Sequence, residues 1–122
     1  MPAKRPEELH KLFVKAFNAG DLEGLVALYE PEAALATAEG AARGSAALRE
    51  AYRGFLAPGA AIRLETLSVL ECGDLALLQG RWVLEGTERA PARREGRNAE
   101  VARRQANGDW LLLIDVPNPP GG

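Results

Sequence analysis

The sequence predicts an α+β domain in which helices come first and an antiparallel sheet follows. Apolar residues recur at helical spacing up to residue 56, whereas from residue 61 onward they alternate as they do in strands. A chain of 122 residues also fits one domain with a single core. We therefore predict one domain over residues 1–122, with its core in 6–117 and a mobile tail at 118–122.

The first helix is predicted to begin at Pro6, a residue that fits the first turn of a helix, and Glu7 and Glu8 suit its positive end. Its apolar face consists of Leu9, Leu12, Phe13, Ala16 and Phe17. On this pattern, His10 lies on the solvated face of the helix. A functional role for His10 is therefore not expected.

A second short helix is predicted after Asp21, whose side chain suits the N-cap position. Its apolar stripe runs from Leu22 to Tyr29, and Pro31 ends it. The small residues of 33–37 then form a candidate strand.

A third helix is expected after a loop over residues 40–44, with Ser45 as its N-cap, and is expected to end before Pro58-Gly59. The residues predicted to form its buried face are Leu48, Ala51, Tyr52 and Phe55.

Three long strand segments follow, over residues 61–70, 75–85 and the hairpin 96–116. In the first, the apolar phase moves from Ile62 and Leu64 to Leu67 and Val69, a slip of one residue that a β-bulge absorbs. We therefore expect a strongly curved sheet.

The hairpin carries most of the candidate polar chemistry. Asn107-Gly108 predicts a tight two-residue turn, because both residue types tolerate positive φ. After that turn the apolar run 110–114 ends on a lone carboxylate, Asp115. A carboxylate in this position calls for a partner or a function.

Composition excludes several classes of function. The net charge of −2 gives no general attraction to nucleic acid, and the six arginines between residues 89 and 104 have no aromatic residue among them. We interpret this basic segment as a solvated loop, although it could also steer an anionic ligand. No apolar run is long enough to span a membrane, and the N-terminus lacks the apolar region of a secretory signal, so we expect a cytoplasmic protein without membrane contact.

The numbers of cysteine and histidine residues also give little support for a metal or cofactor site. Cys72 is the single cysteine and His10 the single histidine, which excludes an internal disulfide and a cysteine or histidine metal cluster. We predict no metal and no cofactor.

Three segments in this order resemble a known family: FNAGDLEGLVALYEPEAAL (17–35), GSAALREAYRGFL (44–56) and ARRQANGDWLLLIDVP (102–117). The chain is similar over residues 6–117 to the SnoaL-like and ketosteroid-isomerase-like branch of the nuclear-transport-factor-two-like superfamily. The resemblance implies a cone in which three helices close one face of a bent sheet around an open-ended apolar cavity. It also implies a homodimer formed through the outer face of the sheet.

The catalytic roles of the isomerase transfer poorly to this sequence. By the family's spacing, the tyrosine donor falls on Phe13 and the aspartate base on Thr37, neither of which can play that part. The second carboxyl donor falls on Glu100, which keeps a carboxyl group. The resemblance therefore implies the fold without the full set of isomerase residues.

The remaining polar candidates are Glu100, Arg104 and Asp115. Alternation along the strands groups Glu100 with Ala102 and Arg104, and Asp115 with Leu111 and Leu113. Pairing across the hairpin brings Asp115 toward Glu100, so the two carboxylates and Arg104 could form one polar strip. Either carboxylate could act as a general acid or base, or all three groups could form a structural ion-pair network.

Large rings are available to line the cavity. Tyr29 and Trp82 suit a pocket rim because each has a polar tip, whereas Phe17 and Tyr52 are interpreted as core packing. The predicted ligand-binding residues are Phe13, Tyr29, Thr37, Trp82 and Arg104.

Three functional hypotheses remain. The first is a domain that binds a small apolar or cyclic molecule. The second is an isomerase, hydratase or hydrolase that uses Asp115 or Glu100 as acid or base. The third is a dimeric protein-interaction module.

Overall fold

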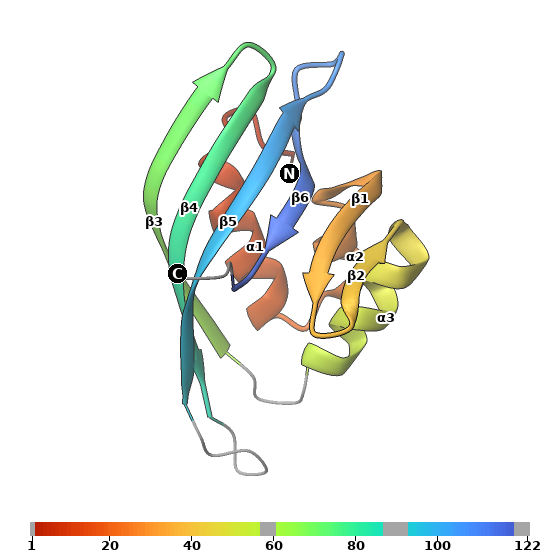
Figure 1. Cartoon of the computed structure of the whole chain (residues 1–122), viewed down its shortest axis with the longest axis vertical. Helices are drawn as coiled ribbons and strands as arrows, with labels where there is room; N and C mark the ends of the chain where they lie inside the picture. The colour runs from red at the N-terminus through yellow and green to blue at the C-terminus, as the bar shows by residue number, and fades with distance from the viewer. Residues whose placement is uncertain (1, 57–60, 87–92, 119–122) are drawn as a thin grey trace.

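The structure is a computed structural model, and it describes residues 2–56, 61–86 and 93–118. Three helices precede most of the sheet: α1 (Glu8–Asn18), α2 (Leu22–Val26) and α3 (Ser45–Phe55). The strands are β1 (Tyr29–Thr37), β2 (Gly40–Arg43), β3 (Ala61–Cys72), β4 (Leu75–Glu85), β5 (Arg94–Arg104) and β6 (Trp110–Val116). They form a six-stranded sheet in the order β2-β1-β6-β5-β4-β3 (Figure 1). The α+β prediction is confirmed.

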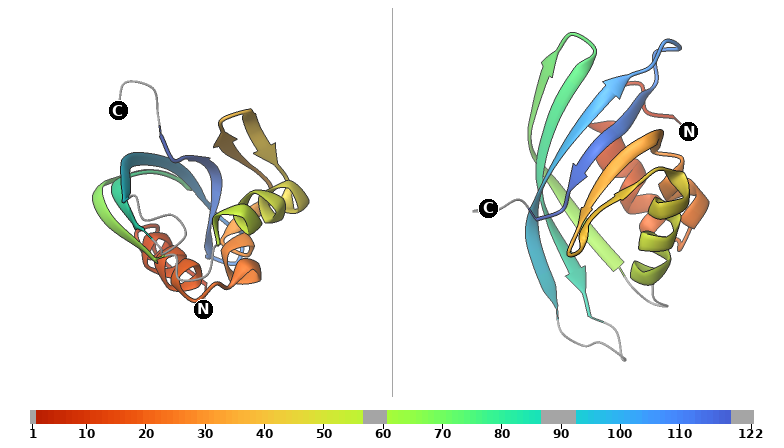
Figure 2. Two further views of the ribbon diagram at one scale, coloured as in Figure 1. Left: turned by 90° about the horizontal axis from the view of Figure 1, so that it is seen from below. Right: turned by 45° about the vertical axis from the view of Figure 1, so that its right-hand side comes forward.

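The sheet is strongly curved and wraps around α1 (Figure 2). The bulge predicted in β3 is present, because the register between β3 and β4 shifts between Thr66 and Ser68. A second shift lies between β5 and β6, where Ala102 faces Leu112 but Val101 faces Ile114. Within the described strands, β1 and β6 pair in parallel and the other neighbours are antiparallel.

The helices lie on the concave side of the sheet. Helix α1 packs against β3 and β6, and α3 packs against β1 and β2. Leu9, Leu25 and Leu48, one from each helix, are fully buried. None of the helices in the described ranges is long and apolar enough to cross a bilayer.

Several local predictions about the helices need correction. The apolar stripe after Asp21 does not continue as a helix to residue 29, because α2 ends at Val26 and Tyr29 already begins β1. The predicted loop 40–44 contains strand β2. Ser45 is the first helical residue of α3, and Gly44, at φ 85°, occupies the N-cap position. The Asp21 cap is confirmed, since its side chain accepts a hydrogen bond from the Gly24 backbone N–H at 2.9 Å.

The hairpin turn also differs from its prediction. Gln105 N–H donates to the Asp109 carbonyl at 2.7 Å, and Gly108 N–H donates to the Gln105 carbonyl at 2.9 Å. Three residues, 106–108, therefore form the loop, and of these Gly108 alone has positive φ. The predicted two-residue Asn107-Gly108 turn is wrong because Asn107 does not adopt the left-handed conformation.

Helix α3 ends at Phe55, before Pro58-Gly59 as predicted. Of the predicted tail 118–122, residues 119–122 lie outside the described residues.

Candidate functional site

A pocket of about 140 Å³ lies between the helices and the concave face of the sheet. Its walls are mostly apolar and come from α1, α3 and five of the strands. Among the wall residues are Leu9, Phe13, Phe17, Ile62, Trp82 and Leu112. Gly96 makes room for one of these rings, because a Cβ atom at that position would lie 2.8 Å from Trp82 Cζ2.

Two buried carboxyl groups form the polar part of this pocket. Glu100 on β5 and Asp115 on β6 are directly opposite each other in the strand register, and each is about 5% exposed. Their pairing depends on the register shift in β6, which makes Leu113 the extra residue. As a result, Leu112 and Asp115 both face the pocket, instead of the predicted set Leu111, Leu113 and Asp115.

Both carboxyl oxygens of Glu100 have hydrogen-bond partners. His10 Nε2 hydrogen-bonds with Oε1 at 2.5 Å, and Asn98 Nδ2 donates to Oε2 at 2.6 Å. The other ring nitrogen of His10, Nδ1, pairs with the Thr66 hydroxyl at 2.7 Å. Helix α1 is thereby connected to β3 and β5 through one buried side chain.

Asp115 is held on its other side by two tyrosines. Tyr52 hydroxyl pairs with Tyr29 hydroxyl, which in turn donates to Asp115 Oδ2. The pKa of Asp115 is raised to about 8, because burial and the charge of Glu100 raise it by more than the hydrogen bond from Tyr29 lowers it. Burial also raises the pKa of Tyr29 and of Tyr52, so both hydroxyls keep their protons.

At neutral pH the pocket thus holds a protonated Asp115 beside the carboxyl group of Glu100. Such a pair can donate a hydrogen bond through one group and accept one, or a proton, through the other. The Asn98 Oδ1 atom, also buried beside the pocket, has no hydrogen-bond partner among the described residues. The site therefore offers polar atoms to a ligand at one end of an apolar space.

The structure brings together some of the residues predicted to bind a ligand. Phe13 and Trp82 line the pocket, while Tyr29 lies behind its wall and reaches it through Asp115. Thr37, at the end of β1, is not among the lining residues.

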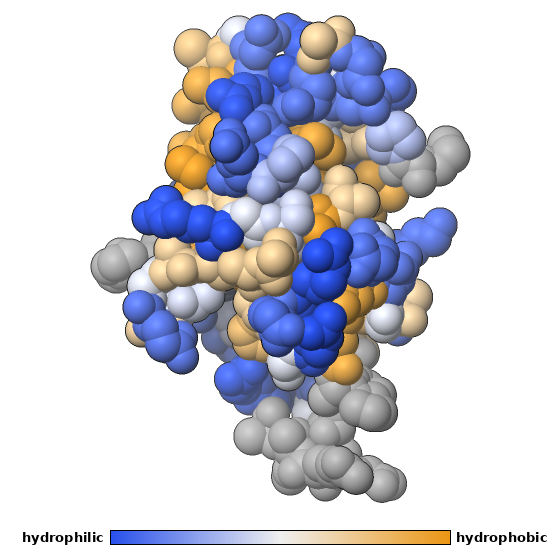
Figure 3. All heavy atoms as spheres, turned by 90° about the vertical axis from the view of Figure 1, so that its right-hand side faces the viewer, coloured by the Kyte–Doolittle hydropathy of each residue, from blue (hydrophilic) through white to orange (hydrophobic). Residues whose placement is uncertain are grey.

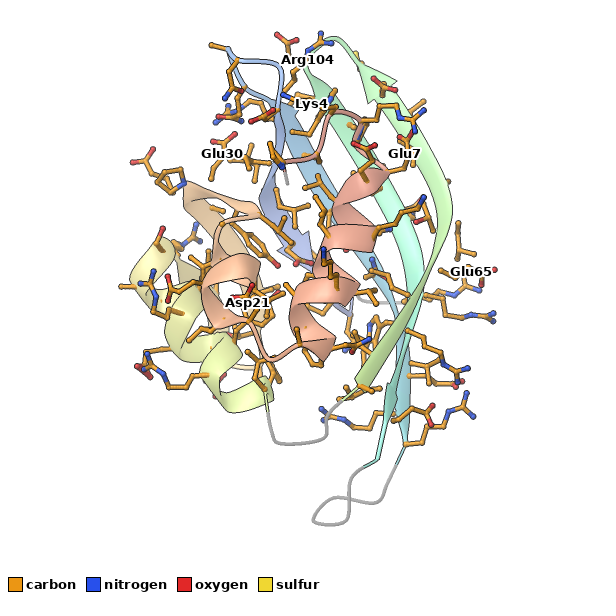
Figure 4. All side chains as sticks on the ribbon, turned by 180° about the vertical axis from the view of Figure 1, so that it is seen from behind. Lys4, Glu7, Asp21, Glu30, Glu65 and Arg104 are labelled. Carbon is orange, nitrogen blue, oxygen red and sulfur yellow. The ribbon has the colours of Figure 1, made fainter. Side chains whose placement is uncertain are left out.

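Arg104 is separated from the two carboxyl groups. It forms an ion pair with Asp74 at 2.6 Å and lies over the Trp110 ring. Arg104 and Lys4 both lie at the end of the molecule that holds the hairpin loop (Figure 4). Alternation does place Arg104 and Glu100 on one face, but four residues of strand put their Cα atoms roughly 13 Å apart.

Three polar residues of the site were missed by sequence reasoning: His10, Tyr52 and Asn98. The prediction of a solvated His10 is wrong, because this side chain is buried and hydrogen-bonded to Glu100. Its position one residue after Leu9 places it on the edge of the apolar face, and this was the available signal. Tyr52 and Asn98 both lie on buried faces, where a polar atom needs a partner.

No group of three or more potential metal ligands occurs in the described part of the chain.

Comparison with known proteins identifies a matching family and several structures of similar fold. Residues 10–112 match the SnoaL-like domain family, whereas no curated protein matches the chain. A protein with a cystatin-like fold from Nostoc punctiforme is similar at 20% identity and a TM-score of 0.78, over 94% of this chain and 89% of that one. A ketosteroid isomerase-like protein from Erwinia carotovora atroseptica has 20% identity and a TM-score of 0.72, over 90% and 89%.

An NTF2-like protein with a cystatin-like fold from Novosphingobium aromaticivorans has 23% identity and a TM-score of 0.78, over 94% of this chain and 79% of that one. These identities support the fold alone. The family match, which spans most of the chain, supports membership as well. On its sequence and its fold, the chain belongs to the SnoaL-like domain family.

Proposed function

We propose that this domain binds a small cyclic molecule that carries a carbonyl or similar oxygen, with that oxygen against Asp115 and Glu100. The observation that carries the proposal is the buried carboxyl pair at one end of an apolar pocket. A volume of about 140 Å³ suits one ring, since an engineered apolar cavity of about 150 Å³ binds benzene. Apolar walls with a few convergent polar groups are typical of small-molecule sites.

A pair of matched probes tests the proposal. Cyclohexanone and methylenecyclohexane have the same shape, but only the ketone can accept a hydrogen bond from the carboxyl pair. We expect cyclohexanone to bind roughly five- to tenfold more tightly, the size of one net hydrogen bond. The preference should fall above about pH 8, where Asp115 ionises and loses its donor.

Nitrogen-15 NMR can follow this binding through the two tryptophan indoles. Trp82 lines the pocket and its Nε1–H donates to the Pro117 carbonyl at 2.9 Å, so its signal should shift and saturate. Trp110 is buried outside the pocket and serves as the internal control. If neither probe shifts Trp82 at millimolar concentration, the binding proposal is wrong.

Catalysis by the same pair is the second candidate function. A carboxylate beside a protonated carboxyl group can remove a proton from carbon while the carbonyl oxygen receives a hydrogen bond. A cyclohexanone titration in heavy water distinguishes the two candidates. If the hydrogens next to the carbonyl exchange with the solvent in the wild type, and this exchange is lost in Glu100→Gln, the result supports an enzyme. Binding without exchange supports a binding domain.

The outer face of the sheet supports a homodimer. Leu70, Leu77, Val101 and Ile114 are successive register partners across β3, β4, β5 and β6. Leu70, Leu77 and Ile114 are 68%, 39% and 44% exposed, so this outer row is apolar and open to a partner. By contrast, the face formed by β1, β2 and α3 mixes hydrophilic and apolar residues (Figure 3).

Sedimentation of Leu77→Asp tests the dimer. A charge in the middle of the outer row should dissociate a dimer, because burying an unpaired carboxylate costs several kcal/mol. Ala41→Asp places the same charge on the exposed strand β2 and should leave the dimer intact. If the wild type sediments as a monomer at micromolar concentration, the homodimer is wrong. It is also wrong if a heavier species forms only when another protein is added.

A further inference from the structure

Arg94 gives the pocket a positive charge at its mouth. It is the first residue of β5, its side chain is exposed, and it lines the same pocket as Glu100. Even spacing along the strand places Arg94, Asn98 and Glu100 on one face of β5. Among the described residues that line the pocket, Arg94 is the one arginine or lysine.

The nearest acidic residues are engaged with other cations. Arg93 pairs with Glu85 at 3.4 Å and with Glu95 at 3.9 Å, and Arg63 also contacts Glu85, at 3.1 Å. Arg94 takes part in none of the ion pairs between described residues. Its guanidinium is therefore available to a ligand at the mouth, and a guanidinium can bind a carboxylate through two parallel hydrogen bonds.

The two ends of the pocket have opposite electrostatic character. Glu100, inside, is the partner of His10 and Asn98 and lies against Asp115. A negatively charged ligand group would be repelled from that end and attracted by Arg94. An anion is thus directed to the mouth, while a neutral oxygen fits the interior.

We infer that the ligand is a monocyclic organic acid, with its carboxylate on Arg94, its ring in the apolar pocket and a neutral oxygen against the carboxyl pair. This inference rests on the proposed function and adds the anionic group. The ring keeps the two polar ends of the ligand apart, as the pocket keeps Arg94 apart from Glu100.

The probes that test this inference are cyclohexanone with a carboxylate on the opposite ring carbon, and the methyl ester of that acid. Both share the ring and the ketone, and only the acid is charged at neutral pH. In the wild-type protein we expect the acid to bind roughly five- to tenfold more tightly than the ester, a ratio that corresponds to a charge-assisted hydrogen bond at an exposed site. Added salt should reduce this ratio.

Arg94→Gln should remove the preference for the acid, so that acid and ester bind with similar affinity. Arg93→Gln is the matched control, because it removes the same charge from the adjacent residue, which pairs with Glu85 and Glu95 and does not line the pocket. Arg93→Gln should keep the preference for the acid.

Equal binding of acid and ester by the wild type overturns the inference but leaves the proposed function standing. If the acid, the ester and cyclohexanone all fail to bind, the proposed function is overturned. Loss of the preference in both variants shows general charge attraction, and this outcome also overturns a specific role for Arg94.

Discussion

Asp115→Asn is expected to stabilise the protein above about pH 8 and to change its stability little below about pH 4. In the folded state, burial and the neighbouring Glu100 raise the pKa of Asp115 from its ordinary value of 3.8 to about 8. Between these two values the unfolded chain releases a proton that the folded protein keeps, so wild-type stability falls as the pH rises. Asparagine cannot ionise and escapes this loss, which we expect to reach a few kcal/mol.

The pKa of Asp115 depends on the side chains around it, and the substitution should leave their contacts in place. Glu100 from β5 raises its pKa by like charge, Tyr29 from β1 donates a hydrogen bond, and Tyr52 from α3 contacts Tyr29. His10 from α1 faces Glu100. An asparagine carbonyl can still accept the bond from Tyr29, so the variant keeps the packing and removes the charge.

Urea unfolding of both proteins at about pH 5, pH 7 and pH 9 measures the difference. The gain of Asp115→Asn over the wild type should grow with pH and level off above about pH 8. Asp74→Asn, at an exposed residue paired with Arg104, is the control and should shift stability by no more than about 0.5 kcal/mol. A constant difference across this range would show that Asp115 does not change protonation there.

Much of the fold could be predicted because the apolar pattern records which face of each element is buried. The one-residue slip between Ile62 and Leu67 predicted the bulge in β3, and the observed register shift lies there. Where a pattern ends, prediction was weaker. Tyr29 suits either the end of an apolar helical stripe or the start of a strand, and its pairing with Leu112 in β6, far along the chain, decides for the strand.

The site was less predictable, because its geometry depends on contacts that the pattern does not contain. Pairing across the hairpin correctly brought Glu100 opposite Asp115. Strict alternation could not show the shift at Leu113 or the separation of Arg104, which lies beyond the buried part of β5. The role of His10 depends on Glu100, which is 90 residues away in sequence.

His10→Leu is expected to destabilise the protein by about 1–3 kcal/mol. The substitution leaves the Glu100 carboxyl group, which is 5% exposed, with Asn98 as its remaining hydrogen-bond partner among the described residues. A buried polar group that loses its hydrogen-bond partner costs this much because it stays removed from water without compensation. Leucine fills most of the imidazole volume, so loss of packing contributes little.

Two further variants separate the hydrogen bond from the shape of the side chain. His10→Gln keeps an N–H donor for Glu100 and should lose clearly less stability than His10→Leu. Adding Glu100→Gln to His10→Leu removes the buried carboxyl group and should restore part of the loss. Urea unfolding of the wild type, His10→Leu, Glu100→Gln and the double variant measures this as a coupling energy. If the Gln and Leu variants are equally unstable and the double variant shows no coupling, His10 contributes through packing alone. A strong coupling would mean that α1 is held to β5 by the contact between His10 and a carboxyl group of the pocket, so that the stability of the fold and the chemistry of the site depend on one histidine.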